Sequence, residues 1–369
     1  MEPHDTPATS SSAIQHRIDT FLELVVNQGG SDLHLISGNP PRIRLFGEVV
    51  TIKYRSLSPD ETQDLLYEIM PPMAKRTFES EHGVDFAYEI PRMSRFRVNA
   101  FRHLGGIGAV FRVIPSKVPS LESMRLPPIC RALCENRKGL VLVTGPTGSG
   151  KSTTLAAMVD HINESRKAHI ITIEDPIEYL HDRKSSLISQ REVGIHTESF
   201  AAALRSALRE DPNVLLVGEM RDLETIHLAA TAAETGILVM GTLHTNGAAA
   251  AVDRMINVFP AKEQALIRTI LSTSLVGVLS QQLVRRIDGR GRLAAIEVML
   301  NTSAASNMIR EGKTEQLANV IQGGGLMGMQ SMDTALRRLL DAKQITGTEA
   351  YMKSTNKADF QQYCEDPLE

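Results

Sequence analysis

The chain of 369 residues contains no tryptophan, only 4% aromatic residues and three cysteines. Three cysteines are too few, and odd in number, for a disulfide framework, so we expect reduced thiols. Cys130 and Cys134 have a spacing that a pair of zinc ligands could share, but the sequence has no second pair. We therefore expect these two residues to be ordinary, partly buried thiols.

Long apolar runs and an excess of positive charge are also missing. No apolar run approaches the roughly 20 residues that a membrane-spanning helix needs. Residues 1–13 (MEPHDTPATSSSA) lack the basic start and apolar core of a secretory signal. The formal net charge is −3, whereas a protein that mainly binds nucleic acid usually has a basic surface. We therefore expect a cytoplasmic protein without a transmembrane segment and without a nucleic-acid partner.

The first third of the chain reads as a small α+β domain. Residues 1–12 are rich in Ser, Thr and Pro and predict a disordered tail. Apolar residues at helical spacing predict a helix near residues 14–25, ended by Gly29 and Gly30. A helix start signal predicts a second helix over residues 58–70, ended by two prolines. Strands are predicted over residues 32–36, 42–46 and 48–52, the last two joined at Gly47, and over VDFAYEI, RFRVNAF and GAVFRVI. We assign this domain to residues 13–114.

A proline-rich stretch over residues 115–137 predicts an interdomain linker with a short helix near residues 129–134. Beyond it, runs such as GLVLVT, AHIITIE, NVLLVGE and GILVMGTL are apolar on both faces and alternate with helical stretches. This pattern predicts a mainly parallel sheet covered on both sides, which is an α/β fold. Helices are predicted after residue 300, over 302–313, 314–322 and 331–343. We assign residues 138–369 to this second domain and its C-terminal helical part.

The nine residues GPTGSGKST match the phosphate-binding pattern G-x-x-x-x-G-K-[ST]. The predicted strand before them and the predicted helix after them are the context that such a loop requires, which argues against a chance match. Glycines allow backbone N–H groups to turn toward a phosphate, and the helix start adds its positive end. We expect Lys151 to contact the β- and γ-phosphates of ATP and Ser152 to ligate Mg²⁺. The predicted nucleotide-binding residues are Gly145, Pro146, Thr147, Gly148, Ser149, Gly150, Lys151, Ser152 and Thr153.

Acidic residues follow two of the predicted strands. Glu219 ends NVLLVGE, where a P-loop enzyme usually places the carboxylate that acts on water or metal. We predict that Glu219 polarises the attacking water, directly or through the metal sphere, and that Glu174 supports the site. The alternative for both residues is that they only cap the ends of strands. Asp175 also follows this strand, and because it precedes Pro176 the alternative is that it only starts a turn.

A histidine follows a third predicted strand. In GTLHTN, His244 stands between Thr242 and Thr245 at the end of an apolar run. Its side chain could donate a hydrogen bond to the γ-phosphate or respond to its loss, and a purely structural histidine is the alternative. We predict the functional role because of the strand-end position.

Taken together, these motifs resemble the secretion-superfamily ATPases, most closely the type IV pilus retraction ATPases. The resemblance covers about residues 14–345 and includes GGSDLHL, PPRIRLFGEV, SQREVG, ALRSALREDPNVLLVGEMRDLETI, TAAETG and GMQSMDTAL. It implies a PAS-like N-terminal domain and a RecA-like ATPase domain. It also implies a homohexamer at the cytoplasmic face of the inner membrane, peripheral to it, that disassembles pili and supports twitching motility. The implied partners are an inner-membrane pilus platform protein and a paralogous ATPase.

The same resemblance implies that arginines of the N-terminal domain complete the ATP site. Carried onto this sequence, the candidates are Arg97 in RFRVNAF and Arg112 in VFRVIPS. Arginine suits the role because its planar fork can bind γ-phosphate oxygens. Arg95 and Arg102 compete for it, and a solvated strand face is the alternative. ATP binding is expected to draw this domain onto the P-loop domain across the linker.

There are four alternatives to a principal retraction motor, two of them within the resembled family. Assembly and secretion ATPases are longer and usually carry a four-cysteine zinc insert, which this chain lacks. An accessory retraction ATPase is the second: Ser306 and Met308 depart from the principal motor's usual pattern, whereas GMQSMDTAL favours the principal form. A RecA-like nucleic-acid translocase is the third, which the acidic balance and scarce aromatic residues disfavour. A nucleotide-binding regulator without turnover conflicts with the complete set of site residues.

Overall fold

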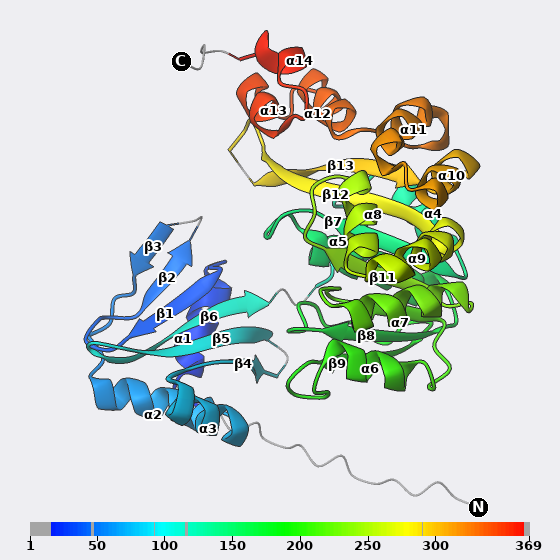
Figure 1. Cartoon of the computed structure of the whole chain (residues 1–369). Helices are drawn as coiled ribbons and strands as arrows, with labels where there is room; N and C mark the ends of the chain where they lie inside the picture. Colours follow the sequence, from blue (N-terminus) through cyan, green and yellow to red (C-terminus); the bar gives the residue numbers. More distant parts are fainter. Residues whose placement is uncertain (1–15, 46–47, 92, 115–116, 290, 365–369) are drawn as a thin grey trace, which may run out of the picture. The chain divides into compact units, whose positions relative to one another are not determined.

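The computed structural model describes residues 16–45, 48–91, 93–114, 117–289 and 291–364. The chain divides into two compact units, Met1–Ser116 and Lys117–Glu369 (Figure 1). The tail predicted over residues 1–12, the junction predicted at Gly47 and the first two residues of the predicted linker lie outside the described residues. Each unit has a hydrophobic core of its own.

The N-terminal unit is built on a six-stranded antiparallel sheet with the order β3-β2-β1-β6-β5-β4. Its strands are β1 (Asp32–Ile36), β2 (Arg42–Leu45), β3 (Glu48–Thr51), β4 (Gly83–Ile90), β5 (Ser94–His103) and β6 (Gly106–Ile114). Its helices are α1 (Asp19–Asn27), α2 (Pro59–Ile69) and α3 (Pro72–Glu81). Helix α3 was not predicted from the sequence, because the two prolines after α2 are also a typical helix end. Pro72 is instead the first residue of α3, where a missing N–H costs no hydrogen bond.

One face of this sheet is apolar and the other is charged. Alternate residues such as Phe96, Val98 and Phe111 are buried together with apolar residues of all three helices. The intervening positions carry Arg97, Arg112 and other polar residues. The alternation, clearest along β5, is typical of an antiparallel sheet that packs on helices through one face.

The C-terminal unit contains a seven-stranded sheet with the order β13-β12-β7-β11-β10-β8-β9. All neighbouring strands are parallel except β12 and β13, which are antiparallel. The strands are β7 (Gly139–Thr144), β8 (His169–Glu174), β9 (Leu187–Glu192), β10 (Val214–Val217), β11 (Leu238–Leu243), β12 (Leu275–Arg285) and β13 (Arg292–Leu300). The predicted parallel sheet is therefore confirmed. Strands β9, β12 and β13 were not predicted, because polar residues such as those of LISQRE and LSQQLVR interrupt their apolar pattern.

Helices cover both faces of the parallel sheet. One face packs against α4 (Ile129–Glu135) and α5 (Lys151–Ser165). The other packs against α6 (Phe200–Ala207), α7 (Leu223–Glu234), α8 (Ala248–Asn257), α9 (Ala261–Ser274), α10 (Ser303–Glu311) and α11 (Leu317–Gly323). The central strands β7, β10 and β11 are completely buried, which is why their sequences read as continuous apolar runs.

The remaining helices are α12 (Met332–Asp341), α13 (Gly347–Lys353) and α14 (Ala358–Gln361), and short 3₁₀ turns lie at Thr314–Gln316 and Gly325–Met327. Helices α12, α13 and α14 form a separate cluster with β12 and β13 through residues such as Val284, Leu336 and Phe360 (Figure 1). The three helices predicted beyond residue 300 correspond to α10, α11 and α12, whereas α13 and α14 were not predicted. Within the described residues, no helix is both long and apolar enough to cross a membrane.

Candidate active site

The predicted phosphate-binding loop connects β7 to the first residue of α5 (Figure 1). Gly145, Gly148 and Gly150 have φ values of 140°, 76° and 86°, which L-residues with side chains rarely adopt. The Lys151 ammonium group donates hydrogen bonds of 3.0 Å to the carbonyl oxygen of Gly145 and 3.1 Å to that of Pro146. The Lys151 side chain therefore folds back onto the loop. Lys151 is also the first residue of α5, whose first N–H groups have no acceptor within the helix.

Burial lowers the pKa of Lys151, and the negative charge of Glu219 opposes this shift. Lys151 is only 7% exposed. A buried cation beside a carboxylate is a site with strong local fields, because both charges are partly removed from water.

Gln281 of β12 holds the loop from the neighbouring strand, and it was not identified from the sequence. Its side chain is fully buried. Its Nε2 donates a hydrogen bond of 2.6 Å to the carbonyl oxygen of Ser149, and its Oε1 accepts one of 2.8 Å from the Thr154 hydroxyl. The Gln281 and Gly145 backbones also approach one another closely, since a Cβ atom on Gly145 would lie 2.2 Å from the Gln281 carbonyl oxygen. The sequence feature that points to Gln281 is the polar pair Gln281–Gln282 inside an otherwise apolar strand. Buried polar side chains need hydrogen-bond partners.

Glu219 and His244 meet at the ends of neighbouring strands. Glu219 follows β10 and His244 follows β11, and these strands pair in parallel. The distance from His244 Nε2 to Glu219 Oε1 is 3.3 Å. On its other side, His244 Nδ1 lies 3.5 Å from the Thr147 hydroxyl of the phosphate-binding loop. The structure thus brings the predicted acid, the predicted histidine and the loop together.

Arg221 is a second residue of the site that was not identified from the sequence. Its guanidinium group forms a two-pronged ion pair with the Glu219 carboxylate, with 2.5 Å between Nη2 and Oε2. Burial raises the pKa of Glu219, but the hydrogen bond from Arg221 and the charges of His244 and Lys151 outweigh it, so the pKa is lowered overall. Arg221 could have been identified from its position two residues after Glu219, because this spacing permits a bidentate ion pair.

Glu174 lies on the strand next to Glu219. Its strand, β8, pairs with β10, and the Gly218 N–H donates a hydrogen bond of 2.7 Å to the Ile173 carbonyl. The Thr172 hydroxyl donates to Glu174 Oε1 at 2.7 Å. Burial raises the pKa of Glu174 despite this hydrogen bond. The two residues thus follow neighbouring strands, and their carboxylates have opposite pKa shifts.

Other residues named from the sequence occupy supporting positions. Asp175 is exposed, and its charge raises the pKa of Arg221 after the larger effects of Glu219. The Tyr179 hydroxyl donates a hydrogen bond of 3.1 Å to the Thr153 hydroxyl. The Thr242 hydroxyl donates one of 2.5 Å to the Gly218 carbonyl, which ties β11 to the turn before Glu219.

The residues present fit a magnesium nucleotide. Ser152 is exposed in the first turn of α5, and the buried Ser149 hydroxyl has no hydrogen-bond partner among the described residues. The described residues contain no group of three or more His, Cys, Asp or Glu side chains that could hold a metal ion alone. Magnesium usually binds through one or two protein groups together with phosphates and water, and Ser152 with Glu219 match this arrangement.

Arg97 and Arg112 lie directly opposite one another on β5 and β6 of the N-terminal unit. Arg112 Nε donates a hydrogen bond of 3.0 Å to Asp32, a residue that is 4% exposed. Arg97 Nε lies 3.9 Å from Asp85 Oδ1. Both arginines therefore lie on the charged face, each beside a carboxylate.

The competing arginines differ in their surroundings. The Arg102 guanidinium lies 5.5 Å from the centre of the Phe78 ring of α3. This contact places Arg102 toward the helix-covered side of the sheet. Arg95, two residues before Arg97 on β5, lies on the same charged face as Arg97 and Arg112 and stays a candidate.

Comparison with known proteins assigns the chain to a family. Residues 8–364 match the profile of the type II/IV secretion system protein family. The chain is 50% identical over 343 residues to the type IV pilus retraction ATPase PilT of Pseudomonas aeruginosa. This match covers 93% of this chain and 99% of PilT. It is 40% identical over 342 residues to the type IV pilus ATPase PilU of the same organism, covering 93% and 90%. A crystal structure of the pilus retraction motor PilT with bound ADP matches with a TM-score of 0.88 and 42% identity, covering 94% of this chain and 99% of that one.

The fold and the P-loop site define a RecA-like ATPase domain preceded by a smaller N-terminal domain. The chain belongs to the type II/IV secretion system protein family and, within it, to the branch that contains PilT.

Proposed function

We propose that this protein is an ATP-hydrolysing motor that retracts type IV pili. The observation that carries the proposal is the link from Thr147 through His244 to Glu219, which joins the phosphate-binding loop to a catalytic acid. A regulator that only binds nucleotide has no use for such a link. The relationship to PilT, which extends over nearly all of both chains, supplies the direction of action.

The opposite pKa shifts of Glu219 and Glu174 support different roles for the two carboxylates. Glu219, whose pKa is lowered, stays ionised and suits a place beside Mg²⁺ together with Ser152. Glu174, whose pKa is raised by burial, is proposed to support the site from the neighbouring strand β8. Bound Mg²⁺ would supply charge neutralisation at the phosphates. Lys151 and the first N–H groups of α5 bind the phosphates themselves.

Arg97 and Arg112 are proposed to complete the site from an N-terminal unit. Their neighbouring positions on β5 and β6 support the proposal, because both side chains are exposed there, at 42% and 69%, and a guanidinium fork can bind γ-phosphate oxygens. A homohexameric ring, peripheral to the cytoplasmic face of the inner membrane and acting on a pilus platform protein, follows from the proposed function. Domain closure over ATP would couple hydrolysis to movement of the ring.

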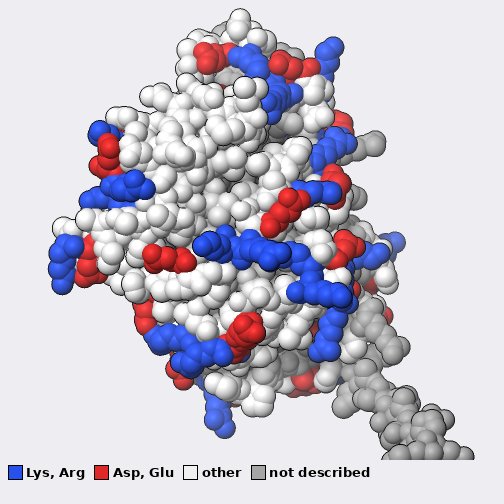
Figure 2. Space-filling model, turned by 90° about the vertical axis from the view of Figure 1, so that its right-hand side faces the viewer, with Lys and Arg blue, Asp and Glu red and all other residues white. Residues whose placement is uncertain are grey.

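The principal retraction motor is favoured over an accessory one. The identity to PilT is 50%, whereas that to PilU is 40% over a similar length. A nucleic-acid translocase is disfavoured. On the face drawn in Figure 2, Lys and Arg side chains are interspersed with Asp and Glu rather than forming one basic stripe.

Deletion of the gene tests the proposed function. Cells without the protein should carry surface pili that extend and do not retract, and expression of the intact gene should restore retraction. Bald cells would instead indicate a role in assembly. Strong, salt-dependent DNA binding by the purified protein, with ATP turnover stimulated by DNA, would favour a translocase.

A further inference from the structure

A hollow of about 490 Å³ opens in the C-terminal unit at the end of the sheet opposite the P-loop. It is lined by Arg137, Arg166, Lys167, Ala168, Asn213 and Gly236. These residues lie just before β7, β8, β10 and β11, at the amino-terminal ends of the parallel strands. The P-loop, Glu219 and His244 follow the carboxyl-terminal ends. The hollow is therefore separate from the nucleotide site.

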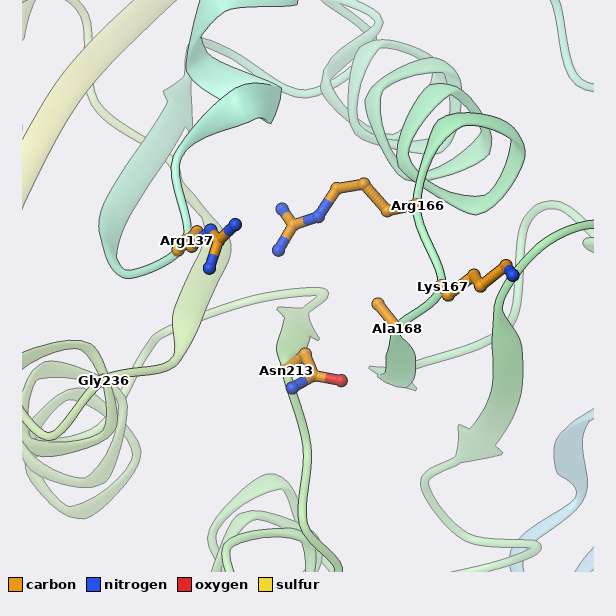
Figure 3. A pocket seen from close by; sticks show the side chains of 6 residues that line it. All are labelled: Arg137, Arg166, Lys167, Ala168, Asn213 and Gly236. Carbon is orange, nitrogen blue, oxygen red and sulfur yellow. The ribbon is translucent and has the colours of Figure 1, made fainter.

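Two guanidinium groups point into this hollow. Figure 3 shows the side chains of Arg137 and Arg166 extending toward one another into the same space, whereas Lys167 extends away from it. The pKa of Arg166 is lowered by burial and, next, by the positive charge of Arg137. Within the described parts of the chain, none of the three cations forms an ion pair with a carboxylate. A bound anion would relieve the repulsion between the two guanidinium groups.

Part of this charge has a structural role. Arg166 Nη1 donates hydrogen bonds of 3.3 Å to the Cys134 carbonyl and 3.0 Å to the Asn136 carbonyl, at the C-terminal end of α4. Cations are favourable at helix C-termini, so Arg166 stabilises this corner of the fold. Among the described residues, Arg137 has neither a carbonyl nor a carboxylate acceptor, so it has no such role.

The opposite wall supplies a neutral donor. The Asn213 Oδ1 accepts a hydrogen bond of 2.8 Å from the His169 N–H. This bond fixes the amide, so the group that Asn213 can offer to a ligand is its NH₂. Planar guanidinium groups with an amide donor are well suited to the oxygen atoms of a phosphate.

The size of the hollow indicates more than a single ion. Binding sites for small molecules usually measure about 300 to 1,000 Å³. A second hollow of about 390 Å³, reaching His161 and Arg131, shares Arg137 and Arg166 with the first. Arg137 and Arg166 thus line both hollows.

We propose that Arg137 and Arg166 bind the phosphate group of a small phosphorylated ligand at the amino-terminal edge of the parallel sheet. Arg137 is the residue dedicated to the ligand, and Arg166 contributes while it also caps α4. The site takes no part in ATP hydrolysis.

Calorimetric titration with inorganic pyrophosphate tests the proposal. The full-length protein is first saturated with ADP, without free Mg²⁺ and at constant ionic strength, so that the P-loop is occupied. One further binding event per chain is expected. Arg137→Gln should weaken it roughly tenfold or more, as expected for loss of a charge-assisted hydrogen bond. ATP turnover of this variant should stay normal, which also verifies that it folds.

Two control variants distinguish this site from the P-loop and from the general surface charge of the protein. Lys138→Gln removes the neighbouring exposed cation, which does not line the hollow, and should leave pyrophosphate binding within about twofold, because exposed charges act weakly at a distance. Lys151→Ala disables the P-loop and should leave the further event in place. Absence of that event, its loss in Lys151→Ala, or equal weakening by Arg137→Gln and Lys138→Gln would overturn the proposal.

Discussion

The side-chain amide of Gln281 donates a hydrogen bond of 2.6 Å to the carbonyl oxygen of Ser149 and so anchors the phosphate-binding loop to β12. The same side chain accepts the hydroxyl of Thr154 from α5. One fully buried residue therefore fixes both the loop and the helix that together bind phosphate. Because β12 also supports the C-terminal helices through the cluster around Val284, the loop is connected to that region as well.

Replacing Gln281 with methionine keeps the side-chain volume and removes both hydrogen bonds. The Ser149 carbonyl and the Thr154 hydroxyl would lose these partners, which should lower the free energy of unfolding by about 1–3 kcal/mol. The KM for ATP should rise more than kcat falls, because the loop that binds phosphate is loosened. Steady-state kinetics and denaturant unfolding measure both effects. The control is Gln282→Met on the same strand, and a KM equal to that of the control would contradict the assigned role.

Glu219→Gln should retain nucleotide binding and lose turnover. The amide has nearly the same shape, but it cannot supply the negative charge that acts on Mg²⁺ or water. We expect a fall in kcat of about 100-fold or more, in the range typical for loss of an acid–base or electrostatic group. Fluorescent nucleotide binding and phosphate release measure the two properties separately. Near-normal turnover in this variant would remove Glu219 from the catalytic site.

Arg221→Gln should move the pH dependence of ATP turnover. Arg221 helps to hold the pKa of Glu219 below its ordinary value, so its loss raises that pKa. Glu219 acts as a carboxylate, and activity is lost as the pH falls through its pKa. The acid limb of kcat/KM against pH should therefore shift to higher pH in the variant.

A matched control for this profile is Arg205→Gln, which breaks an ion pair with Glu224 elsewhere on the same unit. The control profile should coincide with that of the wild-type protein. An unchanged acid limb in Arg221→Gln would show that the ion pair does not govern the ionisation that limits turnover.

Much of this site could be predicted from the sequence because its parts are local. Nine consecutive residues specify the loop, and Glu219 and His244 directly follow apolar strands that are easily recognised. Parallel strands bring their carboxyl ends to one edge, so the meeting of these residues follows from the fold. The same locality explains why the mainly parallel sheet of the second domain could be predicted.

The missed parts depend on contacts between distant segments. Gln281 contacts Ser149 across 132 positions in the sequence, and the polar pair Gln281–Gln282 indicates a buried polar residue but not its partner. β9 lies at the edge of the sheet, and its residues 189–192 are polar although they are half-buried or buried, so its apolar periodicity is weak. Helix α3 could not be predicted because the two prolines at its start are also a signal for the end of the preceding helix. Tertiary packing, rather than local preference, decided each of these.

Arg97→Ala and Arg112→Ala should each lower kcat of the assembled protein, by about 10-fold or more if the guanidinium group contacts the γ-phosphate. Arg102→Ala is the control, because Arg102 packs against Phe78 and not on the charged face. Turnover and ATP affinity are measured on protein of the same oligomeric state. If both variants matched Arg102→Ala, the N-terminal unit would supply no arginine to the site, and Arg95 would need the same test.

The central claim is that ATP hydrolysis at Glu219 retracts pili. It is tested most directly by imaging labelled pili in cells whose only copy of this gene encodes Glu219→Gln. We predict that these cells extend pili at the normal frequency and that the fraction of pili that retract falls to the level of the gene deletion. Normal retraction in this strain, or a loss of pili altogether, would contradict the account.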